Sequence, residues 1–411
     1  MKVTFFLNQF PASSETFVIN QIIGFINQGI EVKIIATCKG DLNNKHKSLS
    51  DYKLLELTTY LTDESVYDTV LKKRCKRILS LVKPKNAIKK ILALNVRRFG
   101  IHSKSLLLPS IASNLNKPIQ ADVFIAHFGT AGVVAHKMQK IGLLKGKLAT
   151  VFHGADISVS SILDVFKSDY KSLFRDTELM LPISALWKKR LIELGCEESK
   201  IYLNRMGINT EQFKRRAFDT PLSSPLEIIT VARFIEKKGI FDALAAMRIL
   251  KEQGVNFKYK IIGDGELRPE IEKNIADLGL AQNVTLSGFQ PQEQITTLLS
   301  NSDVFLLPSV TASNGDMEGI PVALMEAMAM GLITVSTCHS GIPELISHNE
   351  SGLLTDERSP HQIAQEIARL VNGEINTTLM RAEAVQKIEQ CFEQKKLYNE
   401  LLRALARVNE L

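Results

Sequence analysis

The chain has 411 residues, of which 45% are hydrophobic and 23% are charged, and its formal net charge is +7. These values predict a soluble globular protein with two packed cores. No apolar run approaches the roughly 18 residues of a membrane span, and the first residues lack the length and the cleavage site of a secretory signal. The five scattered cysteines have no CxxC spacing, which predicts reduced thiols in a cytoplasm and no zinc site.

The first half of the chain alternates short apolar strands with amphipathic helices. We expect helices at 15–28 and 185–194, and strands at 3–7, 32–36, 122–126, 148–152 and 179–183. A strand-helix-strand alternation of this kind predicts a parallel sheet covered by helices.

The segment 72–98 interrupts this pattern with eleven basic residues and no acidic one. Apolar residues lie between the charges, and Pro84 divides the segment into two short helices. A basic amphipathic surface favours contact with an anionic membrane, and a solvated helical face is the alternative. Nucleic-acid binding is disfavoured because no aromatic side chain that could stack on a base interleaves before Phe99.

A second alternating series follows the polar stretch 213–225. We expect strands at 227–231, 259–262, 284–287, 304–308 and 334–336, helices between them, and an almost wholly helical segment at 357–410. The chain is therefore predicted to be an α/β protein of two doubly wound parallel-sheet domains with a hinge near 206–224. Ligands of such sheets bind at the carboxyl ends of the strands, which predicts a site in the cleft between the domains.

Two acids, Glu318 and Glu326, enclose a stretch in which a loop leads into a helix at Pro321. The free amides of the first helical turn and the helix dipole form an anion site. A carboxylate on each side of that site can bind hydroxyls on either side of a phosphate, as in a nucleotide-sugar. The alternative is a surface acid at 318 and a first-turn partner of the helix dipole at 326.

Arg233 and Lys238 follow the first strand of the second series. A guanidinium and an ammonium leaving one strand end can clamp a diphosphate. They stabilise the negative charge that a leaving diphosphate gains during glycosyl transfer. A solvated basic loop is the alternative, and Lys237 is the residue expected to be solvated.

His153 stands beside a glycine just after the strand 148–152, where its ring can reach a sugar hydroxyl or a reacting centre. Asp156 is expected either to orient this histidine or to cap the next helix. His127 occupies a similar position at the end of another strand. A structural role is the alternative for both histidines.

Further candidates lie in loops that follow strands. Gly263 belongs to a Gly-Asp-Gly turn where the backbone can approach a ligand, although a plain tight turn is the alternative. Gly288 and Phe289 can offer a backbone edge and a stacking face to a base. Ser14 and Glu15 either begin the helix 15–28, with a serine as its cap, or bind an acceptor.

Together these residues resemble the retaining glycosyltransferases of family 4, which have the GT-B architecture, over essentially the whole chain. Glu318 to Glu326 is similar to the E-x7-E motif of the family. Arg233 and Lys238 match its diphosphate-binding pair, and His153 matches its cleft histidine. The segments 11–17 and 127–129 resemble a branch that builds bacterial exopolysaccharides of the colanic-acid type.

The resemblance implies transfer of a hexosyl group from a nucleotide diphosphate sugar to a glycan or a lipid-linked saccharide, with retention of configuration and without a metal or other cofactor. It implies that Glu318 contacts the donor sugar and Glu326 the ribose. The remaining donor contacts would be phosphate or sugar at Gly319, Ile320 and Pro321, a backbone approach at Gly263, and the base at Gly288 and Phe289. The stretch 309–317 departs from the family pattern and is expected to reshape donor specificity or to act as a lid.

The resemblance also divides the chain into an acceptor-binding domain at 1–205, a donor-binding domain at 206–385, and a helix at 386–411 that packs back on the first domain. Acceptor-side candidates are Ser14, Glu15, His127 and Asp156. We expect a cytoplasmic protein that contacts the inner face of the cell membrane through 72–98, with no nucleic-acid partner. A non-catalytic nucleotide-sugar-binding protein on the same scaffold is the alternative, and the missing GxGxxG fingerprint disfavours a dehydrogenase.

Overall fold

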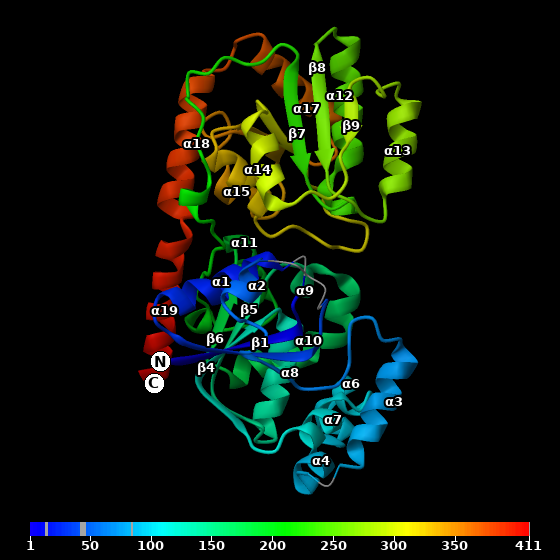
Figure 1. Cartoon of the computed structure of the whole chain (residues 1–411), viewed down its shortest axis with the longest axis vertical. Helices are drawn as coiled ribbons and strands as arrows, with labels where there is room; N and C mark the ends of the chain where they lie inside the picture. The colour runs from blue at the N-terminus through cyan, green and yellow to red at the C-terminus, as the bar shows by residue number, and fades with distance from the viewer. Residues whose placement is uncertain (13–14, 42–46, 84, 411) are drawn as a thin grey trace.

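The computed structural model describes residues 1–12, 15–41, 47–83 and 85–410 (Figure 1). The first of its two sheets has six parallel strands in the order β3-β2-β1-β4-β5-β6. They are β1 (Lys2–Phe10), β2 (Glu31–Lys39), β3 (Thr58–Tyr60), β4 (Ile119–His127), β5 (Leu144–Phe152) and β6 (Leu179–Pro182).

The second sheet also has six parallel strands, in the order β12-β11-β10-β7-β8-β9. They are β7 (Leu226–Val231), β8 (Phe257–Ile262), β9 (Val284–Leu286), β10 (Val304–Leu307), β11 (Ile333–Thr337) and β12 (Leu353–Thr355). The order of connection therefore reverses between β1 and β4 in one sheet and between β7 and β10 in the other. Such switch points are where doubly wound sheets bind ligands.

Helices cover both sheets. Those before the second sheet are α1 (Thr16–Asn27), α2 (Lys47–Asp51), α3 (Val70–Leu81), α4 (Ala87–Ala93), α5 (Val96–Phe99), α6 (Ile101–Lys104), α7 (Leu107–Asn114), α8 (Gly129–Lys140), α9 (Ala155–Ser158), α10 (Ser160–Asp176) and α11 (Ala185–Glu193). The later ones are α12 (Ile240–Glu252), α13 (Arg268–Asp277), α14 (Gln292–Ser300), α15 (Val322–Ala329), α16 (Ile342–Leu345), α17 (Pro360–Val371), α18 (Thr377–Cys391) and α19 (Gln394–Glu410). Short 3-10 turns lie at Glu198–Lys200 (η1), Thr210–Gln212 (η2) and Glu236–Lys238 (η3).

The predicted pair of doubly wound parallel sheets is confirmed, with local differences. The helical segment expected at 357–410 is divided into α17, α18 and α19. Two edge strands of three residues each, β3 and β12, were not expected. Strands this short carry too little alternation to be recognised in a sequence.

The central strands are buried on both faces, as in β1, where Val3, Phe5 and Phe6 have no exposed surface. Continuous apolar runs are the mark of parallel strands covered on both sides.

In the same part of the molecule, α3, α4, α6 and α7 form a small helical lobe that projects away from the second sheet (Figure 1). Among the described helices, none has the length and apolar content needed to cross a membrane.

The chain passes between the two sheets twice. We call the part of the molecule around the first sheet the first half and the part around the second sheet the second half. After the first crossing, α18 packs on α15 of the second half. The chain then crosses back, and α19 lies on α1, β4 and β5 of the first half (Figure 1). Gly24 makes the return possible, because a Cβ there would lie 2.2 Å from the ring of Tyr398. The two crossings touch: the Ile208 N–H donates to the Phe392 carbonyl at 3.0 Å, and the Gln394 N–H donates to the Ile208 carbonyl at 2.9 Å.

Candidate active site

Glu318 lies in the loop between β10 and α15, and little of its surface is exposed. Its Oε1 is 2.7 Å from Nζ of Lys238. Burial alone would raise the pKa of Glu318, but the positive charges of Lys238 and Lys237 outweigh burial and hold the pKa below its usual value. The second half of the chain therefore presents an ionised carboxylate that is already paired with a cation.

Glu326 stands on α15, which begins directly after Pro321. Its side chain is half-buried, and its Oε1 accepts a hydrogen bond from Nε2 of Gln292 at 3.3 Å. Burial raises the pKa of Glu326 to about 7. Unlike Glu318, it has no ion pair with another described residue.

The predicted basic pair is unequal in its surroundings. Lys238 lies in η3 and is engaged with Glu318, whereas Arg233 is exposed and has no side-chain hydrogen bond or ion pair within the described residues. The expectation that Lys237 is solvated is wrong. Its Nζ pairs with Oδ1 of Asp316 at 3.0 Å and bonds the Met317 carbonyl, because the loop before Glu318 folds back over η3.

The stretch 309–317 is held along most of its length. Oε2 of Glu236 accepts hydrogen bonds from the Ser313 hydroxyl at 2.7 Å and from its N–H at 3.0 Å, next to the pair made by Lys237. The loop also reaches the first half of the chain, where the Ser160 N–H donates to the Asn314 carbonyl at 3.3 Å. A Cβ on Gly315 would lie 2.9 Å from the Ser158 carbonyl. In this arrangement the loop bridges the two halves at the start of α10.

His127 and His153 meet at the ends of β4 and β5. Nδ1 of His127 lies 3.0 Å from Nε2 of His153, and the rings stack with centroids 5.2 Å apart. Phe17 and Phe128 pack on His153 with ring centroids 4.8 and 4.5 Å away. Burial lowers the pKa of His127 to about 3, and burial together with His127 lowers the pKa of His153 well below its usual value. Both rings are therefore neutral at pH 7.

Two acceptor-side candidates are placed differently from the expectation. The ring of His127 is fully buried behind His153, so its contact is with that histidine and not with an acceptor. Asp156 is also buried, and burial raises its pKa to about 6. Its carboxylate accepts the N–H groups of Gly129 at 2.7 Å, Gly154 at 2.9 Å and His153 at 3.1 Å. Asp156 therefore ties together the two loops that carry the histidines.

The other acceptor-side candidates lie near the start of α1. Glu15 is half-buried at the N-cap position without a side-chain cap bond, and burial raises its pKa to about 7. Ser14 lies outside the described residues. Phe17, on the same helix, reaches the His153 ring, so this loop borders the histidine pair.

The two halves touch next to these groups. A Cβ on Gly319 would lie 3.2 Å from the His153 carbonyl and 2.4 Å from Cδ1 of Ile183. The absence of a side chain at Gly319 lets the loop of Glu318 lie close against the end of β5. Glu344 joins the halves nearby, since its carboxylate accepts the Ala185 N–H at 2.6 Å and pairs with Arg205 at 3.0 Å.

Of the remaining donor candidates, Ile320 is buried in the loop before α15, and Gly263, Gly288 and Phe289 follow β8 and β9. The Gly263 N–H donates to the Gly288 carbonyl at 2.9 Å. A Cβ on Gly263 would lie 1.8 Å from the Ala232 carbonyl, so close packing of the turn by itself accounts for this glycine. Phe289 is 82% exposed, and Gly288 before it has φ +65. An open aromatic face of this kind is available to stack on a base.

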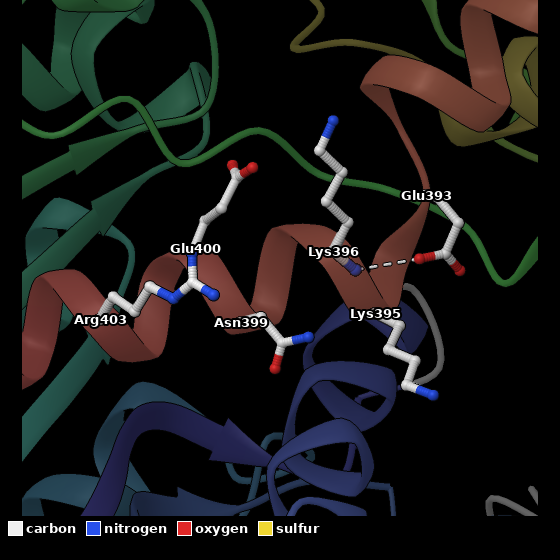
Figure 2. Close-up of a pocket in the computed structure, with 6 residues that line it drawn as sticks. All are labelled: Glu393, Lys395, Lys396, Asn399, Glu400 and Arg403. Carbon is white, nitrogen blue, oxygen red and sulfur yellow. Dashed lines mark hydrogen bonds between the residues drawn. The ribbon is translucent and has the colours of Figure 1, made fainter.

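A surface hollow of about 400 Å³ lies elsewhere, on α19 (Figure 2). Six polar side chains line it: Glu393, Lys395, Lys396, Asn399, Glu400 and Arg403. None of them belongs to the groups described above. Within the part of the chain that the structure describes, no three His, Cys, Asp or Glu side chains gather as a metal site requires.

His339 is not among the residues predicted from the sequence, yet it is fully buried and hydrogen-bonded to the backbone of Glu318. The sequence contains a pattern that could have identified it, because His339 follows a buried strand just as His153 does. Glu236 and Glu344 are also absent from the predicted residues, and their partners lie 77 and 159 residues away in the sequence. No local pattern identifies contacts of that separation.

Known proteins resemble this chain over almost its whole length. The family model "Glycosyl transferases group 1" matches residues 212–389. The amylovoran biosynthesis glycosyltransferase AmsK of Erwinia amylovora is 47% identical over 410 residues, which cover 99% of this chain and 100% of that protein. The putative colanic acid biosynthesis glycosyltransferase WcaL of Escherichia coli K12 is 46% identical over 405 residues, 98% of each chain.

Solved structures show the same fold. Anabaena HepE in complex with UDP-glucose has a TM-score of 0.70 at 17% identity. The match covers 99% of this chain and 100% of the HepE chain. Sucrose-phosphate synthase from Thermosynechococcus elongatus has a TM-score of 0.71 at 13% identity, and the match covers 99% of this chain and 99% of that one. The predicted GT-B architecture is confirmed. With relatives more than 40% identical over almost the whole length, the chain belongs to the group 1 glycosyltransferases.

Proposed function

We propose that this glycosyltransferase moves a hexosyl group from a nucleotide diphosphate sugar to a saccharide acceptor during synthesis of a bacterial exopolysaccharide, with retention of configuration. One observation carries the proposal. The Lys238–Glu318 ion pair stands beside Gly319, which packs against His153 of the other half. The names of AmsK and WcaL support the exopolysaccharide pathway.

In the proposed complex, each described group has a partner on the donor. Glu318 binds hydroxyls of the sugar, Glu326 binds the ribose, and Phe289 stacks on the base. The ammonium of Lys238 has more than one N–H, so it can serve Glu318 and the diphosphate together. Arg233 is exposed and free of other described partners, so its planar guanidinium is available to the same diphosphate.

The proposed transfer breaks the bond from the anomeric carbon to the diphosphate oxygen and forms a bond from that carbon to the acceptor oxygen on the same face. The proton of the acceptor hydroxyl passes to the leaving diphosphate oxygen. Lys238 and Arg233 stabilise the charge that grows on the diphosphate. His153 is neutral and positions the sugar or the acceptor. With two cations directed at the leaving group, we propose that the reaction needs no metal.

We also propose that the protein acts at the cytoplasmic face of the cell membrane on a lipid-linked or oligosaccharide acceptor. Exposed apolar side chains on α3, at its C-cap and on α4 support this location, with Val70 86%, Val82 81% and Ile88 76% exposed. An exposed cluster of large apolar side chains marks a protein or membrane contact.

The basic residues of 72–98 do not all face outward, contrary to the expected basic surface. Internal acceptors take several of them: Lys76 bonds Asp68, Arg77 bonds Glu64, and Lys89 bonds the Gly142 carbonyl. Arg74, Lys85 and Arg97 remain exposed without described side-chain partners. Apolar insertion with a few flanking cations suits an anionic bilayer, whereas nucleic acid needs many free cations.

The proposed function is tested by a thermal-shift screen with UDP-, GDP- and ADP-sugars, followed by a turnover assay with the sugars that bind. HepE was solved with UDP-glucose, and a mycobacterial relative at 22% identity is described as GDP-mannose-dependent, so both donor classes belong in the screen. A specific donor raises the melting temperature by mass action. Binding without hydrolysis or transfer would instead support the non-catalytic alternative.

A further inference from the structure

Glu318 is held by its backbone as well as by its side chain. Its N–H donates to Nε2 of His339 at 3.0 Å, and its carbonyl accepts a hydrogen bond from Oγ of Ser340 at 2.5 Å. Both partners follow β11, which pairs with the strand β10 that leads into the loop. With Lys238 on the carboxylate, Glu318 is fixed at three points.

The ring of His339 is fully buried, so it acts through Glu318 and does not face a ligand itself. Because Nε2 accepts the Glu318 N–H, the hydrogen of a neutral ring stands on Nδ1. Nδ1 lies 2.6 Å from Oε1 of Glu357, which accepts that hydrogen. Glu357 therefore selects the tautomer that His339 needs in order to hold Glu318.

Glu357 also holds the other end of the same loop. Its Oε2 accepts the Thr311 N–H at 2.8 Å, and its Oε1 accepts the Thr311 hydroxyl at 3.3 Å. A continuous series of hydrogen bonds thus runs from Thr311 through Glu357 and His339 to Glu318. It closes the loop at its base and sets where the Glu318 carboxylate stands.

We propose that His339 is a positioning residue for glycosyl transfer, which keeps the Glu318 carboxylate where the donor sugar binds. The inference rests on the proposed function, in which Glu318 contacts the sugar and not the nucleotide. It follows that loss of the His339 bond weakens handling of a nucleotide-sugar but leaves the affinity for the free nucleoside diphosphate unchanged. If His339 had a merely structural role, its loss would affect the nucleotide-sugar and the free nucleoside diphosphate alike.

The test compares His339→Phe with His339→Gln in the full chain. Phenylalanine keeps the ring volume but has no acceptor for the Glu318 N–H, whereas the side-chain oxygen of glutamine can replace Nε2. We expect His339→Phe to lower kcat/KM for the nucleotide-sugar roughly tenfold to a hundredfold, as misplacement of a catalytic group does. Dissociation constants for UDP and GDP stay the same, and His339→Gln recovers most of the turnover.

His348→Phe is the matched control. Nδ1 of His348 accepts the Leu354 N–H at 3.0 Å in the same half of the chain, without a described contact to Glu318. This variant should leave kcat/KM unchanged. Ser340→Ala provides an independent second variant, because it removes the bond to the Glu318 carbonyl and should produce the same separation between nucleotide-sugar and nucleoside diphosphate.

The outcomes are distinct. Unchanged turnover in both His339→Phe and Ser340→Ala overturns the inference, and so does an equal loss of nucleotide-sugar and nucleoside diphosphate affinity in folded variants. A wild-type chain that neither binds nor turns over any UDP-, GDP- or ADP-sugar overturns the proposed function itself. That failure is recognised before any substitution is made.

Discussion

Nδ1 of His127 lies 3.0 Å from Nε2 of His153, so a buried ring supports the histidine that faces the second half of the chain. Burial keeps both rings neutral, and one hydrogen lies between the two facing nitrogens. The orientation of the His153 ring is therefore fixed by its hydrogen bond with His127 and by its packing against Phe17 and Phe128.

Replacing His127 by phenylalanine keeps the ring volume and removes the hydrogen bond to His153. We expect kcat to fall roughly tenfold, the value of about one hydrogen bond, with little change in nucleoside diphosphate affinity. Steady-state kinetics with the donor found in the screen provides the measurement. Full activity in a folded His127→Phe variant would mean that His153 needs no such support.

Lys238→Ala removes the cation beside Glu318 and the proposed leaving group. Turnover should fall by roughly two to three orders of magnitude while the fold survives. Lys273→Ala, an exposed lysine on α13, is the control and should behave like wild type. Circular dichroism verifies folding, and undiminished transfer by the Lys238 variant would refute the diphosphate clamp.

Donor binding should depend on pH through Glu326, whose pKa burial raises to about 7. Ribose hydroxyls donate hydrogen bonds and so favour the ionised carboxylate, which lowers its pKa in the complex. By linkage, donor affinity is fully present above the pKa of the free protein and is lost as pH falls below 7. We expect a dissociation constant several-fold higher at pH 6 than at pH 8.

Burial also raises the pKa of Glu15 to about 7, so an experiment has to decide which of the two glutamates causes the pH dependence. Glu326→Gln should flatten the pH profile of donor binding, measured by calorimetry, whereas Glu15→Gln should leave its slope intact. A slope that persists in the Glu326 variant would assign the titration to another group.

Val82→Glu combined with Ile88→Glu places one charge at the exposed C-cap of α3 and one on the exposed face of α4. Cosedimentation with vesicles that contain anionic lipid should decrease strongly, because each charge opposes apolar insertion. Leu379→Glu, at a 57% exposed position on α18, is the control and should sediment as wild type does. Equal sedimentation of all three proteins would remove the membrane contact from the proposal.

Removal of divalent metal should leave turnover unchanged, because the proposed reaction relies on Lys238 and Arg233 for charge stabilisation. The measurement is kcat in excess chelator, with and without added magnesium. Activity that disappears with chelator and returns with magnesium would contradict this part of the proposal.

The sequence predicts the two parallel sheets and ten of their twelve strands, but not the edge strands β3 and β12 or the role of His339 after β11. A parallel strand that ends in a loop delivers its next residues to one edge of the sheet, so the sequence places His127 and His153 at neighbouring strand ends, while their contact is a finding of the structure. The facing of Gly319 and His153 followed from two such edges meeting. These inferences depend only on local alternation and on the topology of doubly wound sheets.

What the sequence did not predict depends on the path of irregular segments. Lys237 was expected in solvent but pairs with Asp316, because the stretch 309–317 folds back over η3. The burial of His127 behind another ring also depends on tertiary packing, since its strand-end position alone resembles that of His153. The break between α18 and α19 lies where the chain crosses from one half to the other, and helical propensity does not register such a crossing.

The contact between Ile208 and residues 392–394 has a mechanical consequence. The outgoing and returning segments are hydrogen-bonded to each other where they pass, so neither can bend alone. The two segments pack closely at Gly207, because a Cβ there would lie 2.5 Å from the Phe392 carbonyl oxygen. Any swing that separates His153 from Glu318 therefore has to bend both crossing segments together at this short two-stranded joint.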